Sequence, residues 1–226
     1  VLRLDTEDGK PYIVLVNYTA HGTIMTPEIM HVSGGWPGVM QRTVEDAVGA
    51  GATCLYVNGP EGDVAPTGYT GGSRWEMAEQ YGRRVGERAA GLAKAIATRP
   101  VQHFGMQMRW VTLPPRQGAP DFVKIAGDEY KVTQEQLDQL LQVMFPEQGP
   151  IYGLRINDFA MVSFPGEPIT AIGLPIKQAL RAGGIQYPAI AALTNDLIGY
   201  ILTEEEYHQS GYEVTASFYG PTLGQV

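Results

Sequence analysis

The stretch FAMVSFPGEP (residues 159–168) passes from an apolar run into a polar turn, and this change decides the fold. Residues 159–164 are typical of a buried strand, and Glu167 follows in a rigid Gly-Glu-Pro turn. An apolar run at 12–18 likewise leads to His21, and one at 187–193 leads to Tyr200. In open α/β sheets, binding groups collect where strands end and loops begin. The pattern therefore predicts that three strand ends share one site, which favours an enzyme over a structural module.

The rest of the chain alternates between strand and helix patterns. An Asp8-Gly9 turn between two apolar runs predicts a hairpin at the start. Thr133 is the expected cap of a helix, with an imperfect capping box because Glu135 comes only two residues later. Asn157-Asp158 predicts a second hairpin. Further strands are expected at 52–58 and 101–113, helices at 39–48, 74–97, 134–141 and 169–181, and irregular structure at 114–132.

This order of elements predicts an α/β fold in which one mixed β-sheet is flanked by helices. We expect a single domain over residues 1–226, since no repeat or low-complexity linker interrupts the chain. The chain starts within the first hairpin and without Met, which suggests a piece of a longer polypeptide.

Composition excludes several classes of protein. With 44% hydrophobic and 18% charged residues the chain has a globular balance. A net charge of −8 without a basic cluster argues against a nucleic-acid partner. No apolar run reaches the roughly 18 residues of a transmembrane segment. The single cysteine, Cys54, lies in an apolar run, so we expect buried packing, with a reactive thiol as the alternative.

Three side chains at the strand ends suit a metal ion. A neutral imidazole such as that of His21 is the commonest metal ligand, and Zn²⁺ accepts N and O donors. The carboxylate of Glu167 is fixed by its turn, and a cation can lower the pKa of the Tyr200 phenol as it does for water. Taken singly, each has another interpretation: a structural histidine, a surface turn, and a packing or hydrogen-bonding tyrosine.

Other polar residues have simpler interpretations. Asp63 is expected to accept backbone N–H groups in a tight loop, with catalysis as the alternative. Asn195-Asp196 is expected to order the loop before Tyr200, and Glu204–Glu206 to form the acidic first turn of a helix after Thr203. The remaining histidines are interpreted as loop, structural or solvated residues: His31, His103 and His208.

Four motifs in this order resemble the neutral/alkaline non-lysosomal ceramidase family over essentially the whole chain. They are NYTAHGT (17–23), NGPEGDVAP (58–66), PGEP (165–168) and NDLIGYILTEEEY (195–207). The resemblance implies a zinc-hydrolase-like sandwich, here the C-terminal part of a catalytic domain whose N-terminal part lies outside this chain. That missing part of the polypeptide would be a partner of the chain.

The resemblance also implies a chemistry. It predicts a zinc-dependent amidohydrolase that cleaves the linear amide bond of N-acyl sphingosine or a related lipid with metal-activated water. The motif positions make His21, Glu167 and Tyr200 ligands of Zn²⁺, and Tyr212 the residue that stabilises the oxyanion or positions the substrate. The further ligand would precede Val1. A role in sphingolipid metabolism outside the cell or in the periplasm is implied as well.

One departure from the family pattern bears on activity. Members carry a serine in the Gly-Asp-Val-Ser-Pro loop where this chain has Ala65. If that serine is required for ceramide turnover, the chain acts on another substrate or has lost the chemistry. A non-catalytic structural or assembly module is therefore the alternative, and a metal-binding domain without turnover is a third possibility.

Overall fold

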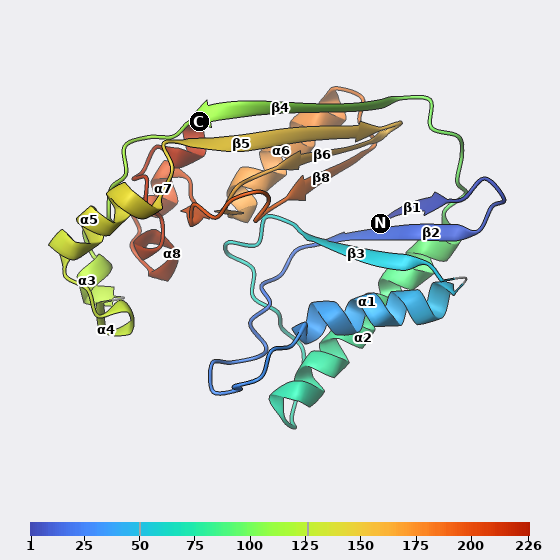
Figure 1. The fold of residues 1–226 in the computed structure, drawn as a ribbon, viewed down its shortest axis with the longest axis horizontal. Coiled ribbons are helices and arrows are strands. Elements are labelled where there is room, and N and C mark those ends of the chain that lie inside the picture. Colours follow the sequence, from blue (N-terminus) through green and yellow to red (C-terminus); the bar gives the residue numbers. More distant parts are fainter. Residues whose placement is uncertain (50, 126) are drawn as a thin grey trace. The chain divides into compact units, whose positions relative to one another are not determined.

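The computed structural model describes residues 1–49, 51–125 and 127–226 (Figure 1). They form two compact units, each described by itself. The first comprises Val1–Asn58 and Ala65–Val101, and the second comprises Gly59–Val64 and Gln102–Val226. The expectation of one domain over the whole chain stays a prediction. In the part that the structure describes, no helix is long and apolar enough to cross a membrane.

The first unit contains a three-stranded sheet in the order β1-β2-β3. Strands β1 (Leu2–Asp5) and β2 (Pro11–Tyr18) form the predicted antiparallel hairpin. Strand β3 (Thr53–Asn58) pairs with β2 in parallel, after a crossover through α1 (Gly35–Val48). Helix α2 (Arg74–Ala95) packs against α1, and both lie on one face of the sheet (Figure 1). The predicted strands and helices of this unit are therefore confirmed.

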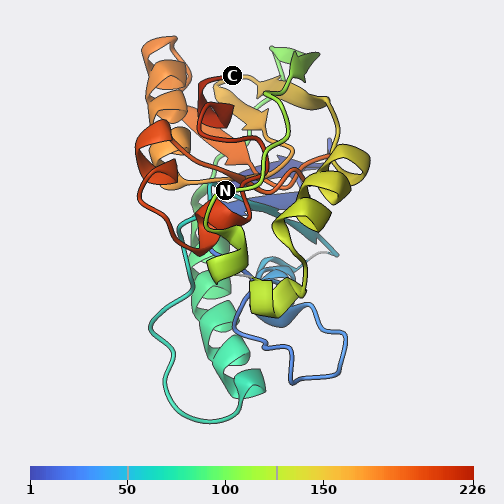
Figure 2. The same cartoon turned by 90° about the vertical axis from the view of Figure 1, so that its left-hand side faces the viewer.

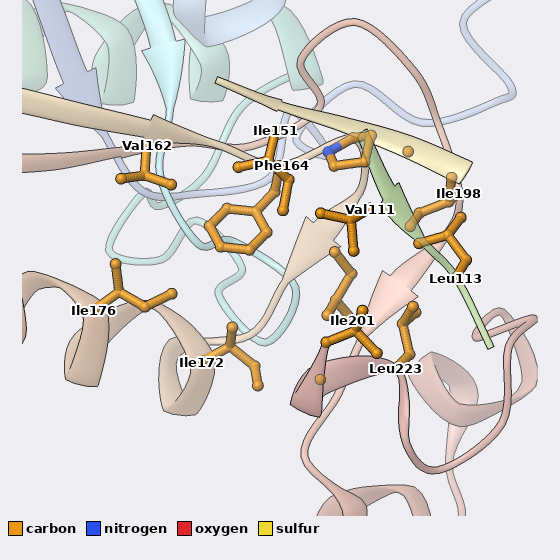
Figure 3. Close-up of a pocket in the computed structure, with 14 residues that line it drawn as sticks. Val111, Leu113, Ile151, Val162, Phe164, Ile172, Ile176, Ile198, Ile201 and Leu223 are labelled. Atoms are coloured by element: carbon orange, nitrogen blue, oxygen red, sulfur yellow. The ribbon is translucent and has the colours of Figure 1, made fainter. Parts of the chain in front are cut away.

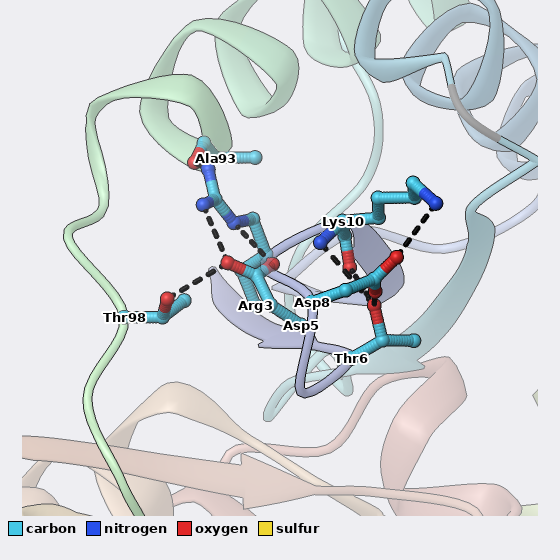
Figure 4. Close-up of polar contacts among 7 residues, drawn as sticks. All are labelled: Arg3, Asp5, Thr6, Asp8, Lys10, Ala93 and Thr98. Atoms are coloured by element: carbon cyan, nitrogen blue, oxygen red, sulfur yellow. Dashed lines mark hydrogen bonds and ion pairs between the residues drawn. The ribbon is translucent and has the colours of Figure 1, made fainter.

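The start of the chain is attached to the far end of α2 through Arg3 (Figure 4). The Arg3 guanidinium donates through Nε and Nη2 to the two Asp5 carboxylate oxygens, each over 2.8 Å. Its Nη1 donates to the carbonyl of Ala93 over 2.9 Å, and the Thr98 hydroxyl donates to Asp5 over 2.7 Å. Fork-shaped pairs of this kind are among the stronger polar contacts in proteins.

The second unit is built on a four-stranded sheet in the order β4-β5-β6-β8. Strands β4 (Phe104–Thr112), β5 (Gln148–Ile156) and β6 (Phe159–Ser163) are antiparallel neighbours. The turn at Asn157, with φ 53°, closes the second predicted hairpin. Strand β8 (Tyr187–Ala191) runs parallel to β6, and the connecting helix α6 (Thr170–Ala182) packs against β8 (Figures 1 and 2).

Glu167 and Tyr200, from two of the polar motifs, lie in a separate two-stranded sheet. Strand β7 (Glu167–Pro168) pairs in parallel with β9 (Tyr200–Ile201). The α/β class, with mixed sheets flanked by helices, is therefore confirmed, but the described strands belong to three sheets and not to one. Two-residue strands have no detectable alternation, which is why the sequence pattern does not reveal this sheet.

The helices of the second unit follow their predicted caps, with two corrections. Helix α5 (Gln134–Met144) begins at Thr133 with a complete capping box, because Gln136 and not Glu135 supplies the returning side chain. The segment expected to be irregular contains α3 (Phe122–Ile125) and α4 (Gly127–Tyr130). The remaining short helices are α7 (Glu204–Tyr207), α8 (Tyr212–Thr215) and the 3₁₀ turn η1 (Leu223–Gln225).

Residues in and next to the two-stranded sheet belong to an apolar core. Phe164, Ile198 and Ile201 are buried together with Ile190, Tyr219 and Leu223. Phe164, Ile198, Ile201 and Leu223 also line a cavity of about 150 Å³ whose labelled side chains are all aliphatic or aromatic (Figure 3). Its lining comes from β4 to β6, from α6 and from the segments that flank Glu167 and Tyr200. The segments that carry Glu167 and Tyr200 are therefore anchored by apolar neighbours that are buried in the core.

Candidate metal and catalytic site

Glu167 and Tyr200 occupy matching positions in the two-stranded sheet. They are direct partners across β7 and β9, and the negative charge of Glu167 is among the causes that raise the pKa of Tyr200. The Glu167 N–H donates to the carbonyl of Gly199 over 3.0 Å, and the Tyr200 N–H donates to that of Ala216, also over 3.0 Å. The structure therefore brings together two of the three predicted metal ligands.

Two glycines permit this close approach of the backbones. A Cβ atom on Gly166 would lie 2.5 Å from the carbonyl oxygen of Gly199. Gly199 has φ +84°, a conformation that favours glycine, and a Cβ there would collide with the carbonyl of Ala216. The glycines of the PGEP and NDLIGY motifs thus have a direct structural reason.

The surroundings of Tyr200 keep its phenol protonated when no cation is bound. Burial is the largest cause that raises the pKa of Tyr200, and the carboxylate of Glu167 adds to it. A cation bound by the Glu167 carboxylate would oppose both effects, because positive charge stabilises a phenolate.

Tyr212 at the start of α8 lies beside Tyr200. The two ring centroids are 6.3 Å apart, at an interplanar angle of 79°. The Tyr212 hydroxyl is 3.3 Å from that of Tyr130, and this hydrogen bond is the largest cause that raises the pKa of Tyr212. Its side chain is 43% exposed, so the protonated hydroxyl can donate to a bound molecule.

Glu61, in the loop after β3, is a further carboxylate of this region that the motif pattern did not single out. It is completely buried, and neither carboxylate oxygen has a hydrogen-bond partner. Burial raises the pKa of Glu61 to about 8, and the negative charge of Glu167 contributes to the rise. The only sequence signal was its place in a strand-end loop, where Gly and Pro neighbours suggest a surface turn.

Neighbouring polar residues have the structural roles that were predicted. Asp63 accepts the backbone N–H of Thr170 over 2.8 Å and its hydroxyl over 2.6 Å, at the first turn of α6. Asp196 accepts the N–H of Leu197 over 2.8 Å in the loop before Tyr200. Thr203 caps α7, whose first turn contains the three glutamates.

His21 belongs to the first unit, so its place among the ligands stays a prediction. It follows β2, it is partly exposed, and its carbonyl accepts the indole N–H of the buried Trp36 over 2.8 Å. His31 lies in an exposed loop with its ring 6.4 Å from that of Trp75. His103 precedes β4 rather than lying within it, and His208 ends α7 as expected.

The donor chemistry of the second unit suits a cation. Glu167 and Tyr200, paired across β7 and β9, provide a carboxylate and a phenol. Zn²⁺ accepts carboxylate oxygen, and oxygen-rich sites also suit Mn²⁺ and Mg²⁺. Across residues 1–49, 51–125 and 127–226, no group of three or more His, Cys, Asp or Glu side chains is arranged to hold a metal. The fit therefore depends on the tyrosine as a donor.

Comparisons with known proteins point to one family. Neutral ceramidase B of Dictyostelium discoideum is 36% identical over 85 residues, which cover 35% of this chain and 12% of that protein. Neutral ceramidase 3 of Arabidopsis thaliana is 34% identical over 79 residues, which cover 32% of this chain and 11% of that protein. No family model matches the sequence.

Solved structures share the fold. The crystal structure of neutral ceramidase from Pseudomonas aeruginosa matches 97% of this chain with a TM-score of 0.74 and 19% identity. A ceramidase solved in complex with C2 matches 97% of the chain with a TM-score of 0.69 and 18% identity. The chain covers 43% and 44% of these two structures. The chain is thus similar to neutral ceramidases in sequence over about a third of its length, and it shares their fold over nearly all of it.

Proposed function

We propose that this chain is part of the catalytic domain of a ceramidase-like, zinc-dependent hydrolase. Its substrate would be a linear amide, either N-acyl sphingosine or a related N-acyl lipid. The observation that carries the proposal is the pairing of Glu167 with Tyr200, with the ring of Tyr212 beside them, in a chain with ceramidase relatives. A place outside the cytoplasm and a role in sphingolipid metabolism remain part of this proposal.

Each residue has a specific task in the proposed reaction. Glu167 and Tyr200 would hold Zn²⁺, and His21 is the predicted third protein ligand. When bound, Zn²⁺ supplies a Lewis acid that makes water nucleophilic near neutral pH. The raised pKa of Tyr212 keeps its hydroxyl protonated. This hydroxyl can then donate to the negative oxygen that develops on the amide carbon.

The first prediction separates metal binding from catalysis. In the natural polypeptide that carries this chain, Glu167→Ala is expected to remove most of the bound zinc and the hydrolysis of N-acyl sphingosine. Tyr212→Phe is expected to keep the zinc and lower kcat by about 10²–10³-fold, the usual cost of one oxyanion donor. Zinc is measured by inductively coupled plasma mass spectrometry, and turnover by release of the free amine.

The same measurements distinguish the proposed hydrolase from a metal-binding domain without turnover and from a structural module. Full zinc in the Glu167→Ala protein contradicts the proposed ligand set. Ala65, in place of the family serine, favours the non-catalytic module. A wild-type protein that binds zinc but hydrolyses none of a panel of N-acyl lipids and N-acyl amino acids would support a metal-binding domain without turnover. Wild-type protein with neither zinc nor turnover would support the structural module.

A further inference from the structure

The loop that carries His21 begins where the pairing of β2 with β3 ends. Tyr18 and Asn58 are the last partners in the register of these two strands, so the residues that follow Tyr18 take no backbone hydrogen bonds from this ladder. Ala20 is nevertheless only 1% exposed. Buried backbone N–H and C=O groups are costly unless they are hydrogen-bonded. The backbone just before His21 therefore depends on side chains for its hydrogen bonds.

The side chain of Asn58 bonds to both backbone groups of Ala20. Its Oδ1 accepts the N–H of Ala20 over 3.3 Å, and its Nδ2 donates to the Ala20 carbonyl over 3.2 Å. The Tyr56 hydroxyl donates to the carbonyls of Tyr18 and Ala20, over 3.1 and 3.4 Å. A carboxamide carries a donor and an acceptor in one plane, so it can replace the backbone of a neighbouring strand. Asn58 thus extends the support that β3 gives to β2 by two residues.

His21 itself is held by α1. The indole N–H of Trp36 donates to the His21 carbonyl over 2.8 Å, and Trp36 is 0% exposed. The rings of Tyr18, Tyr56 and Tyr81 meet the indole edge to face, with centroids 5.1 to 5.7 Å away. An indole packed in this way has little freedom to move, so its N–H is a fixed point for the backbone of His21.

Side chains from β3 and α1 thus converge on two consecutive residues, and the second of these is the predicted metal ligand. A ligand whose backbone is already fixed loses less conformational freedom when the cation binds. Removing a group that orients a metal ligand usually weakens the metal affinity about 10–100-fold. The contacts of Ala20 and His21 can therefore influence metal binding without touching the metal.

We propose that Asn58 and Trp36 are positioning residues for His21, which fix its backbone before a cation binds. This inference rests on the proposed function, in which His21 is a ligand of Zn²⁺. It concerns the first unit alone, and it gives a task to the asparagine that opens the NGPEGDVAP motif.

The test uses matched variants of the natural polypeptide that carries this chain. Asn58→Leu keeps the approximate size of the side chain but removes its donor and acceptor. Trp36→Phe keeps an aromatic ring without the N–H. Gln41→Leu is the control, because the Gln41 amide donates over 2.8 Å to the carbonyl of Cys54, near the other end of β3.

Two quantities are measured in each variant. The affinity for Zn²⁺ is determined by competition with a chromogenic chelator. Hydrogen exchange of the backbone at 18–23 is followed by mass spectrometry in the metal-free protein, so this second readout does not depend on the metal. His21→Ala is included as the variant that lacks the ligand itself.

Asn58→Leu and Trp36→Phe are both expected to bind Zn²⁺ about 10–100-fold more weakly than the wild type. In both, hydrogen exchange at 18–23 should be faster, because the loop has lost hydrogen bonds that keep it closed. Gln41→Leu loses a hydrogen bond of the same kind, but it should keep the wild-type affinity and the wild-type exchange at 18–23.

The outcomes separate this inference from the proposed function. If His21→Ala lowers the affinity while Asn58→Leu and Trp36→Phe bind Zn²⁺ like the wild type, His21 is a ligand that these two residues do not position. An equal loss of affinity in Gln41→Leu would also overturn the inference, because it would reflect stability alone. If His21→Ala itself binds like the wild type, the proposed ligand set is wrong at His21. Should one of the two variants fail to fold, the other decides by the same criterion.

Discussion

The carboxylates of Asp5 and Glu61 are both largely buried, but they differ in their hydrogen-bond partners. Asp5 accepts two N–H groups from Arg3 and the hydroxyl of Thr98, and its side chain is 7% exposed. The hydrogen bond from Arg3 is the largest cause that lowers the pKa of Asp5. Glu61 has no such donor, and burial raises its pKa. A hydrogen-bonded partner therefore favours the charged form of Asp5, whereas burial without a partner favours the protonated form of Glu61.

The Arg3–Asp5 pair makes the stability of the first unit depend on pH. Because the pKa of Asp5 is lower in the folded than in the unfolded chain, the pair stabilises the fold fully above the ordinary pKa of 3.8. Its contribution is lost as the pH falls through the folded value. Asp5→Asn is expected to lower the free energy of unfolding by about 1–3 kcal/mol at pH 7, and by clearly less at pH 3. Urea titrations at both pH values measure the difference.

Asp8 provides the control for this prediction. Its ion pair with Lys10 is exposed, with 57% of the Asp8 side chain and 69% of the Lys10 side chain accessible. Exposed pairs contribute little, so Asp8→Asn should leave the unfolding curve close to that of the wild type. An Asp5→Asn deficit that is equally large at both pH values would contradict the electrostatic account.

Single residues also show where the sequence is informative about the site. The motifs predicted Glu167, Tyr200 and Tyr212 as site residues, and the structure places these three side by side. In the sequence, nothing distinguished Glu61 from the other residues of the NGPEGDVAP motif. Its burial depends on contacts of its neighbours with β7 and α6, more than 100 positions along the chain, and no local pattern encodes them.

At the scale of elements, two glycines set the distance between α1 and α2. A Cβ on Gly82 would lie 2.5 Å from the carbonyl oxygen of Trp36 and 2.6 Å from Cβ of Val39. A Cβ on Gly86 would lie 2.6 Å from Cβ of Thr43. Small residues at this contact let the helix axes approach closely, and a larger side chain would force them apart.

This contact predicts opposite effects of one substitution at two places in α2. Gly82→Ala is expected to lower the free energy of unfolding by about 1–3 kcal/mol, because the added methyl overpacks the interface. Gly91 has no atom within 4 Å of its Cβ position, so Gly91→Ala should raise the free energy by up to about 1 kcal/mol through helix propensity. Urea unfolding followed by circular dichroism measures both. A stabilising Gly82→Ala would show that the two helices do not touch there.

Most elements could be predicted because their signals are local. Alternating apolar runs, the hairpin turns at Asp8-Gly9 and Asn157-Asp158, and the caps at Thr133 and Thr203 all lie within a few residues of what they specify. The division of the strands into three sheets could not be predicted in this way. Which strand pairs with which depends on contacts between distant segments, and β7 and β9 are only two residues long.

At the scale of the whole molecule, the chain spans less than half of the solved ceramidases that share its fold, 43% and 44%. The matched stretches cover only 12% and 11% of the two curated relatives. The activity of a complete ceramidase is therefore a proposal for this chain. The described residues of the second unit nevertheless supply a coherent set of groups: one carboxylate and two phenols on a packed apolar base.

The central claim is that one cation sits between Glu167 and Tyr200. Anomalous diffraction at the zinc absorption edge, from crystals of the zinc-loaded natural polypeptide, tests it directly because the signal locates the metal itself. We expect one strong peak within bonding distance, about 2.0–2.2 Å, of the Glu167 carboxylate and next to the Tyr200 hydroxyl. A zinc peak elsewhere, with none beside Glu167 and Tyr200, would contradict the claim.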